Sequence, residues 1–307
     1  MIGGIRAGAA QERRVPARQR LAYIAYATIA WLGRTLPTTT GRVLFRWAGV
    51  AAFHLLPRRR SIVAANQAQV LGRPVDDPFV RDSTREAFRR YARYWFDGFD
   101  IATWPEERVR REVVFEGLEH PHRALAAGKK GLIAVAPHAG NWDAAGRALA
   151  IEGLPVAAVA ERLRPEALYR LFVAHRESLG MQILPLDEEG LARRLGEILR
   201  ANRTVALVAD RDLSGRGVEV EMFGRPRRLP TGPALLALQT GAPIMVAALA
   251  ETATGWRVVL HRPFTVEPSD DRRADVRATM QRIADLFSRD IAASPADWHL
   301  FQPGWDP

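Results

Sequence analysis

The chain has 307 residues, 48% of them hydrophobic, which is enough to bury a large core in one α/β domain. It contains no cysteine, which excludes disulfides, thiolate metal sites and cysteine nucleophiles. The formal net charge is +10, and of the 44 basic residues only Lys129 and Lys130 are lysines. This charge predicts attraction to polyanions. Anionic lipid or a phosphorylated co-substrate is favoured over nucleic acid, because the sequence lacks zinc-finger spacing, basic heptads and RNA-binding aromatic signatures.

The amino-terminal region combines arginine with apolar residues. Residues 1–20 are rich in Gly, Ala and Arg and are predicted to be a disordered tail, which leaves residues 21–307 as the domain. Two apolar stretches follow, Leu21 to Gly33 and Val43 to Leu56, each bordered by arginine, and the first is shorter than the ~20 residues of a membrane span. Aromatic residues beside flanking charge are typical of interfacial helices, so we expect residues 21–60 to face a membrane. Two ordinary core helices remain the alternative.

Helix and strand patterns alternate through the rest of the chain. Helices are expected at Ser83 to Ile101, His122 to Gly128, Asn141 to Glu152, Pro165 to Leu179, Glu188 to Ala201, Pro233 to Thr240 and Asp270 to Ala293. Strands are expected at Glu112 to Glu116, Gly131 to Ala136, Pro155 to Ala160, Thr204 to Asp210, Pro243 to Ala250 and Arg257 to His261. This order predicts an α/β fold, one domain with a central, mostly parallel β-sheet flanked by α-helices and preceded by N-terminal amphipathic helices. Asp187 is the expected cap of the helix that starts at Glu188.

Functional groups of parallel sheets collect where strands end at their carboxyl side, which directs attention to the residues after Ala136. His138 and Asp143 follow there with the spacing His-x4-Asp. Positions five apart lie ~140° apart on a helix, so the two side chains meet only if His138 precedes the helix and Asp143 is in its first turn. A carboxylate on one ring nitrogen makes the other a better base, which suits proton removal from an alcohol. A histidine at a strand–helix junction beside an unrelated aspartate is the alternative.

Several segments together resemble a known family. Residues 131–143 (GLIAVAPHAGNWD) are similar to the catalytic motif of the lysophospholipid acyltransferase superfamily. They resemble more closely the branch with lipid A late acyltransferases and actinobacterial phosphatidylinositol mannoside acyltransferases. Further matching stretches are AERLRP at 160–165, the segment 172–180 with RES at 176–178, ADRDL at 209–213, FG at 223–224, LPTGPA at 229–234, GAPI at 241–244 and DWH at 297–299. The resemblance covers roughly residues 20 to 305.

The resemblance implies acyl-CoA as the acyl donor and a mannosylated phosphoinositide as the acceptor. We expect the transferred acyl chain to be palmitoyl. It implies His138 as general base and Asp143 as its partner. A second acid beside the histidine falls on Asp210, where the family pattern has the longer glutamate. Asp212 follows the same strand and is a second candidate. Charge pairing with Arg211 or another neighbouring arginine is the alternative for both aspartates.

Arginines after the next strand are candidates for anion binding, because a guanidinium group suits phosphate and carboxylate. We assign Arg162, Arg164 and Arg176 to the acceptor head group or the CoA phosphates, with Arg211, Arg227 and Arg228 as weaker candidates. Solvated surface arginines would look the same in the sequence. No third ligand accompanies His120 and His122, so no metal is predicted, and no cofactor is expected besides acyl-CoA as co-substrate.

Aromatic residues provide two further expectations. Tyr91, Tyr94, Trp95 and Phe96 are candidates to line an acyl pocket, although a core helix has the same pattern. His299 stands among aromatic residues and is expected to pack rather than to catalyse. The protein is expected to bind as a peripheral protein on the cytoplasmic face of the cell membrane, at the inner leaflet, with an anionic membrane glycolipid as its partner. An acyl-CoA thioesterase and a non-catalytic lipid-binding protein of the same fold are the competing functions.

Overall fold

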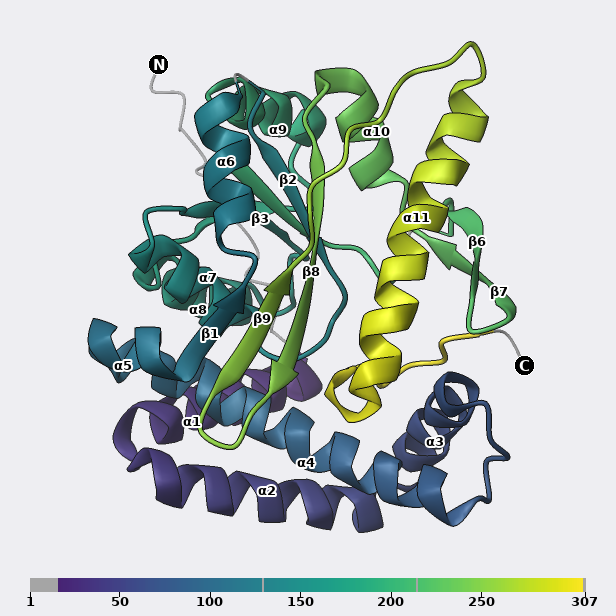
Figure 1. Ribbon diagram of the computed structural model, residues 1–307. Coiled ribbons are helices and arrows are strands. Elements are labelled where there is room, and N and C mark those ends of the chain that lie inside the picture. The colour runs from purple at the N-terminus through teal and green to yellow at the C-terminus, as the bar shows by residue number, and fades with distance from the viewer. Residues whose placement is uncertain (1–15, 129, 214, 306–307) are drawn as a thin grey trace, which may run out of the picture.

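The computed structural model describes residues 16–128, 130–213 and 215–305. A seven-stranded sheet with the order β1-β9-β8-β2-β5-β3-β4 lies at its centre, and only β8 and β9 pair antiparallel in it (Figure 1). Its strands are β1 (Val113–Glu116), β2 (Leu132–Ala136), β3 (Val156–Ala160), β4 (Gln182–Pro185), β5 (Thr204–Val208), β8 (Ile244–Glu251) and β9 (Trp256–Leu260). A separate hairpin is formed by β6 (Val218–Met222) and β7 (Arg225–Leu229). The expected single α/β domain with a mostly parallel sheet is confirmed.

Helices cover both faces of the sheet, and each face has its own core. One core contains α9 (Leu191–Arg200), α10 (Gly232–Thr240) and α11 (Arg272–Ala293), with Leu199 and Phe287 fully buried in it. The other contains α7 (Trp142–Ile151) and the ends of flanking helices, with Trp104 and Trp256 buried. The remaining helices here are α5 (Glu106–Glu112), α6 (Glu119–Ala127) and α8 (Glu166–Ser178). Strands covered on both sides must be apolar along their length, as LIAVA of β2 is.

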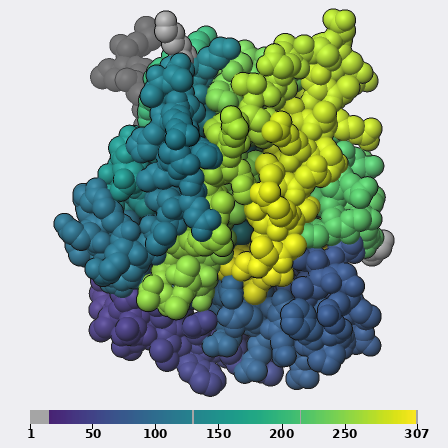
Figure 2. Space-filling view, viewed as in Figure 1, coloured from purple at the N-terminus to yellow at the C-terminus, as the bar shows by residue number. Residues whose placement is uncertain are grey.

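The amino-terminal helices form a layer at one end of the sheet, coloured purple to blue in Figures 1 and 2. They are α1 (Ala17–Thr35), α2 (Thr38–Leu55), α3 (Pro57–Leu71) and α4 (Pro78–Asp100). The carboxyl ends of β2, β3, β4, β5 and β8 point to this layer, whereas β1 and β9 run the opposite way. Helix α4 lies between the sheet and α2, and α1 packs on α4 and α8. The layer therefore covers the edge of the sheet at which functional groups are expected.

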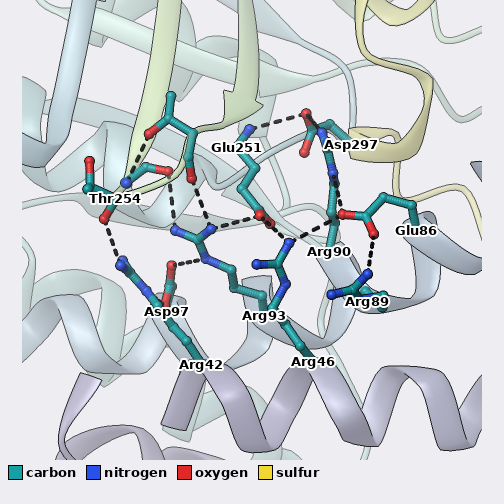
Figure 3. A network of polar contacts seen from close by, with 12 residues as sticks. Arg42, Arg46, Glu86, Arg89, Arg90, Arg93, Asp97, Glu251, Thr254 and Asp297 are labelled. Carbon is teal, nitrogen blue, oxygen red and sulfur yellow. Dashed lines mark hydrogen bonds and ion pairs between the residues drawn. The ribbon is translucent and has the colours of Figure 1, made fainter. Parts of the chain in front are cut away.

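Buried ion pairs connect this layer to the sheet (Figure 3). Arg93 of α4 is 1% exposed and contacts Asp97 at 3.0 Å and Glu251 at 2.7 Å, the latter at the end of β8. Arg42 of α2 binds the other oxygen of Asp97 at 2.8 Å, and Arg46 of α2 binds Glu251 at 3.2 Å. Charges that are removed from water need such partners, so the network fixes the position of α2 and α4 against β8.

Several boundaries differ from the sequence-based expectations. Helix α1 begins at Ala17, inside the segment expected to be a tail, while residues 1–15 lie outside the described part. Helix α4 begins at Pro78, because proline fits the first helical turn and the Asp77 carboxylate accepts a hydrogen bond from the Phe79 N–H. Helix α9 begins at Leu191 after Gly190 in a left-handed conformation, so Asp187 is not its cap. Within the described residues, no helix is both long and apolar enough to cross a membrane.

Candidate active site

His138 lies in the loop between β2 and α7. Gly140 in this loop has φ +57°, and a Cβ atom there would stand 2.7 Å from the Leu249 backbone, so glycine is required for the turn. Asn141 then caps α7, its side chain accepting a hydrogen bond from the Ala144 N–H at 2.9 Å. The loop therefore leaves His138 at the carboxyl end of β2 with its side chain 25% exposed, as the sequence predicted for its position.

Asp210, rather than Asp143, is the carboxylate partner of His138. Its Oδ1 lies 2.5 Å from Nδ1 of the imidazole. The reason is strand register: β2 and β5 are parallel neighbours with Ala136 opposite Val208, so residues two positions further on emerge side by side. A carboxylate only accepts, so in the neutral imidazole Nδ1 carries the proton and Nε2 has the lone pair. Among the described residues, no hydrogen bond involves this Nε2.

The Asp210 carboxylate is held in its charged form. It is fully buried, and burial alone would raise its pKa. The charge and hydrogen bond of His138, a hydrogen bond from the Trp298 indole N–H and the charge of Arg227 outweigh burial and hold the pKa of Asp210 well below its usual value. Arg227 also donates to the Asp210 backbone carbonyl at 2.7 Å. Asp210 thus remains an anion that orients the imidazole.

Asp143 belongs to a different buried pair. Its Oδ1 accepts a hydrogen bond from Nε of Arg176 on α8 at 2.7 Å, and its Oδ2 lies 3.4 Å from the hydroxyl of Tyr94 on α4. Burial would lower the pKa of Arg176, but the adjacent Asp143 charge raises it. The expected His138–Asp143 contact is therefore a wrong prediction, because the first turn of α7 points Asp143 toward α4 and α8. Asp143 instead ties these three helices together beside His138.

Of the other sequence candidates, Arg162 and Asp212 have local partners, and Arg164 is exposed. Arg162 pairs with Asp187 at 3.1 Å and with Glu166 at 3.4 Å, both at the surface. Arg164 is exposed and has no hydrogen bond or ion pair within the described residues. The Asp212 carboxylate accepts a hydrogen bond from the Gly217 N–H at 2.6 Å, so it shapes its own loop.

Arg211 is the one arginine of this group that reaches an apolar groove. The groove has a volume of about 560 Å³ and runs between α1, α2, α4 and the carboxyl-terminal segment. Its lining is mostly apolar or aromatic: Ile29, Phe45, Ala48, Gly49, Ala52, Leu56, Phe88, Tyr91, Ala92, Trp95, His299, Leu300 and Phe301. Arg59, Arg211 and Gln302 supply its polar groups. Of the four aromatic residues expected in an acyl pocket, Tyr91 and Trp95 line the groove, whereas Tyr94 and Phe96 are buried in the protein core.

The groove and His138 are connected through aromatic contacts. His299 lines the groove, and its ring lies 6.4 Å from that of Trp142, which in turn meets the His138 ring edge-on at 5.6 Å. His299 also donates its backbone N–H to the His138 carbonyl at 2.7 Å. Burial lowers the pKa of His299 to about 3, so this ring is neutral and packs, as expected.

Two residues of the site were not singled out by sequence reasoning as partners of the acid. Trp298 and Arg227 both contact Asp210, yet they lie 88 and 17 positions away from it in the chain. The DWH segment at 297–299 was the available signal for Trp298, although its role required the fold. Within the described residues, no group of three or more His, Asp or Glu side chains is arranged to hold a metal ion.

Comparison with known proteins identifies the family of the chain. Residues 9–306 match the family described as bacterial lipid A biosynthesis acyltransferase. A phosphatidylinositol mannoside acyltransferase of Mycobacterium tuberculosis is 44% identical over 248 residues, which cover 78% of this chain and 75% of that protein. The protein of the same name from Mycolicibacterium smegmatis is 37% identical over 295 residues, covering 95% and 94%. The family expected from the motifs is thereby confirmed, and the chain belongs to the bacterial lipid A biosynthesis acyltransferase family.

Proposed function

We propose that this acyltransferase moves a fatty-acyl chain, by expectation palmitoyl, from acyl-CoA to a sugar hydroxyl of a membrane glycolipid such as a phosphatidylinositol mannoside. The names of the similar mycobacterial proteins support this class of acceptor. The observation that carries the proposal is the His138–Asp210 pair at 2.5 Å, because Nε2 of this half-buried imidazole has no hydrogen bond within the described part of the chain and can act as a base.

The proposed reaction proceeds in two steps. Nε2 of His138 takes the hydroxyl proton as the sugar oxygen attacks the thioester carbon, and Asp210 stabilises the imidazolium that forms. The resulting tetrahedral oxyanion needs hydrogen-bond donors, for which we propose the N–H groups at the amino end of α7. The C–S bond then breaks, and the CoA thiolate takes the proton from the imidazolium. Atoms and charge balance without a covalent enzyme intermediate.

The apolar groove suits an acyl chain. Its walls are aromatic and aliphatic, and one of its lining residues, His299, donates its backbone N–H to the His138 carbonyl. Arg59 and Arg211 at the groove suit a phosphate group of the donor or acceptor. The acyl chain would lie in this groove with its thioester toward His138.

The outer helices suit a membrane surface. Large apolar side chains are exposed along α1 and α2 and just after α2: Leu21, Tyr23, Ile24, Trp31, Val43, Leu44, Trp47, Leu55 and Leu56. Exposed apolar side chains that gather beside arginines are typical of surfaces that bind a bilayer. We propose that this layer lies on the inner leaflet at the cytoplasmic face of the cell membrane, which brings a glycolipid acceptor to the groove.

Product analysis by mass spectrometry tests the function. Palmitoyl-CoA is offered with a panel of glycolipids, and acylated glycolipid is expected with the wild-type protein only when an acceptor is present. His138→Ala serves as the blank and is expected to lose about 10²- to 10⁴-fold in rate. A full signal from this variant contradicts the mechanism. Release of free palmitate without any acceptor identifies a thioesterase instead.

A further inference from the structure

The two oxygens of the Asp210 carboxylate have separate donors. Oδ1 binds Nδ1 of His138 at 2.5 Å, and Oδ2 accepts from the indole Nε1 of Trp298 at 2.8 Å. Trp298 is 1% exposed and Asp210 is 0% exposed, so this hydrogen bond is shielded from solvent. A carboxylate with one fixed donor on each oxygen cannot turn about its Cβ–Cγ bond without breaking one of them. The indole therefore sets the direction in which Asp210 presents Oδ1 to the imidazole.

The segment that carries Trp298 also holds the loop of His138. Ala139 and Trp298 form an isolated antiparallel β-bridge. The His299 N–H donates to the His138 carbonyl at 2.7 Å, and the Gly140 N–H donates to the Asp297 carbonyl at 3.0 Å. The backbone of residues 297–299 thus holds the loop of His138 in place, while the Trp298 side chain holds the Asp210 carboxylate.

This stretch is anchored in turn by the buried charges of Figure 3. Asp297 accepts hydrogen bonds from Arg90 at 2.7 Å, from the Ser294 hydroxyl at 2.6 Å and from the Glu251 N–H at 3.1 Å. Arg90 lies on α4 and Glu251 at the end of β8, so the anchor joins the helical layer to the sheet. A segment held at this many points positions Trp298 rigidly.

We propose that Trp298 is a positioning residue of the acyl transfer, which acts through Asp210 to orient and tune the imidazole of His138. The inference rests on the proposed function and assigns a role to a residue that does not touch the reacting atoms.

Other charged groups surround the pair and bear on its titration. Arg227 stacks on the Trp298 ring at 5.0 Å and donates to the Asp210 carbonyl, while Arg211 and the neutral His299 lie nearby. None of them replaces the indole at Oδ2. Loss of that donor makes the Asp210 carboxylate a stronger proton acceptor, so the His138–Asp210 pair holds its proton to higher pH. The acid limb of the pH dependence of kcat/KM is therefore expected to shift to higher pH.

The test compares Trp298→Phe with Trp305→Phe. Trp305 is the matched control, because its ring lies 5.1 Å from the Arg227 guanidinium and 6.0 Å from the Trp298 ring, while its buried indole N–H has no hydrogen-bond partner among the residues that the structure describes. Trp298→Phe is expected to lower kcat by about 10- to 100-fold with KM for acyl-CoA changed less than about twofold, and to move the acid limb. Trp305→Phe is expected to change neither. Equal effects of both variants, or an unmoved acid limb in Trp298→Phe, overturn the proposal.

A double-mutant cycle shows whether the effect passes through Asp210. In an Asp210→Asn background, Trp298→Phe is expected to lower kcat by less than about twofold further, because its target is already neutral. Additive losses contradict the proposal. If Trp298→Phe does not fold, incorporation of 3-benzothienylalanine at position 298 keeps the bicyclic ring and removes only the N–H group, and the same shift and loss are expected.

A second readout does not depend on activity. The indole ¹H–¹⁵N signal of Trp298, identified by its absence from Trp298→Phe, is expected to move upfield in Asp210→Asn, while that of Trp305 stays in place. A stationary Trp298 signal overturns the inference whatever the enzyme does. A wild-type protein without acyl transfer, or an active His138→Ala, contradicts the proposed function instead, so the two failures are distinguishable.

Discussion

At the scale of single residues, two aspartates near His138 have different partners and therefore different predicted effects. Asp210 binds the imidazole, whereas Asp143 neutralises Arg176. A carboxylate that faces a catalytic base stabilises its charged form, while a carboxylate in a buried ion pair mainly holds helices in place. The sequence favoured Asp143 as the partner of His138, because it follows five positions later, whereas Asp210 follows seventy-two positions later.

The first prediction concerns Asp210→Asn. The neutral amide does not stabilise the imidazolium, and its NH₂ group can donate to Nδ1, which favours the tautomer with the proton on Nε2. The value of kcat is therefore expected to fall about 10²- to 10⁴-fold with little change in KM. Steady-state acylation of the glycolipid, followed by mass spectrometry, measures it. Asp290→Asn is the matched control, since Asp290 binds His261 at 2.7 Å in a similar pair outside the site. A loss of the same size in the control argues against a special role of Asp210.

The second prediction concerns His299 and pH. Burial lowers its pKa to about 3 from 6.5, so between these values the unfolded chain binds more protons than the folded one. Stability therefore rises with pH in this window and is lost on acidification. Between pH 7 and pH 5 this histidine is expected to remove about 2 kcal/mol of unfolding free energy.

Urea unfolding at pH 7, 6 and 5 measures this loss. His299→Gln is expected to flatten the pH dependence by that amount, while replacement of the exposed His122 with Gln leaves it as in the wild type. An unchanged slope in His299→Gln shows that the buried imidazole is not the source.

At the scale of elements, the buried ion pairs decide how the helical layer attaches to the sheet. Asp97 is 0% exposed and binds Arg93 at 3.0 Å and Arg42 at 2.8 Å, which joins α4 to α2. The pair of Arg162 with Asp187 is similar in length at 3.1 Å, but its side chains are 33% and 58% exposed. Loss of the Asp97 charge therefore disturbs charges in the interior, whereas loss of the Asp187 charge affects a pair that water already reaches.

The third prediction compares these two pairs. Asp97→Asn is expected to lower the unfolding free energy by about 3–5 kcal/mol, because Arg42 loses its close buried partner and Arg93 is left with Glu251 alone. Asp187→Asn is expected to cost about 0–1 kcal/mol, since water and salt screen an exposed pair. Urea titration at constant pH measures both, and a similar loss for the two variants is the contrary result.

At the scale of the whole molecule, exposed apolar side chains are concentrated on one end. Trp31 of α1 is 62% exposed and Trp47 of α2 is 67% exposed, beside a chain with a net charge of +10. The groove opens next to the same helices. A surface that combines apolar and cationic groups binds anionic bilayers through both forces.

The fourth prediction is that this surface binds anionic vesicles. Trp31→Gln combined with Trp47→Gln is expected to lower the fraction bound to phosphatidylglycerol–phosphatidylcholine vesicles by about tenfold in sedimentation, because two large apolar side chains lose their burial. Leu186→Gln with Leu213→Gln changes exposed apolar residues elsewhere and serves as control. Equal loss in both double variants argues against a defined binding surface.

The sequence by itself determined the fold class, most elements and the position of His138. Runs such as LIAVA at 132–136 are apolar along their whole length, which is the pattern of a strand covered on both faces. The turn of Gly140 and the cap of Asn141 were local features too, so the place of His138 followed from its neighbours in the chain. The β6–β7 hairpin went unrecognised, because four of its strand residues are arginine or proline at 225–228 and the apolar alternation is weak.

Only the tertiary structure decided which groups meet. The His138–Asp210 contact depends on β5 pairing directly with β2 in a register that aligns residues 136 and 208, although β3 and β4 intervene in the chain. The Trp298 contact depends on the return of the carboxyl-terminal segment to the His138 loop. Such contacts are set by strand order and by burial of charge across the whole domain, and neither quantity is local to a stretch of sequence.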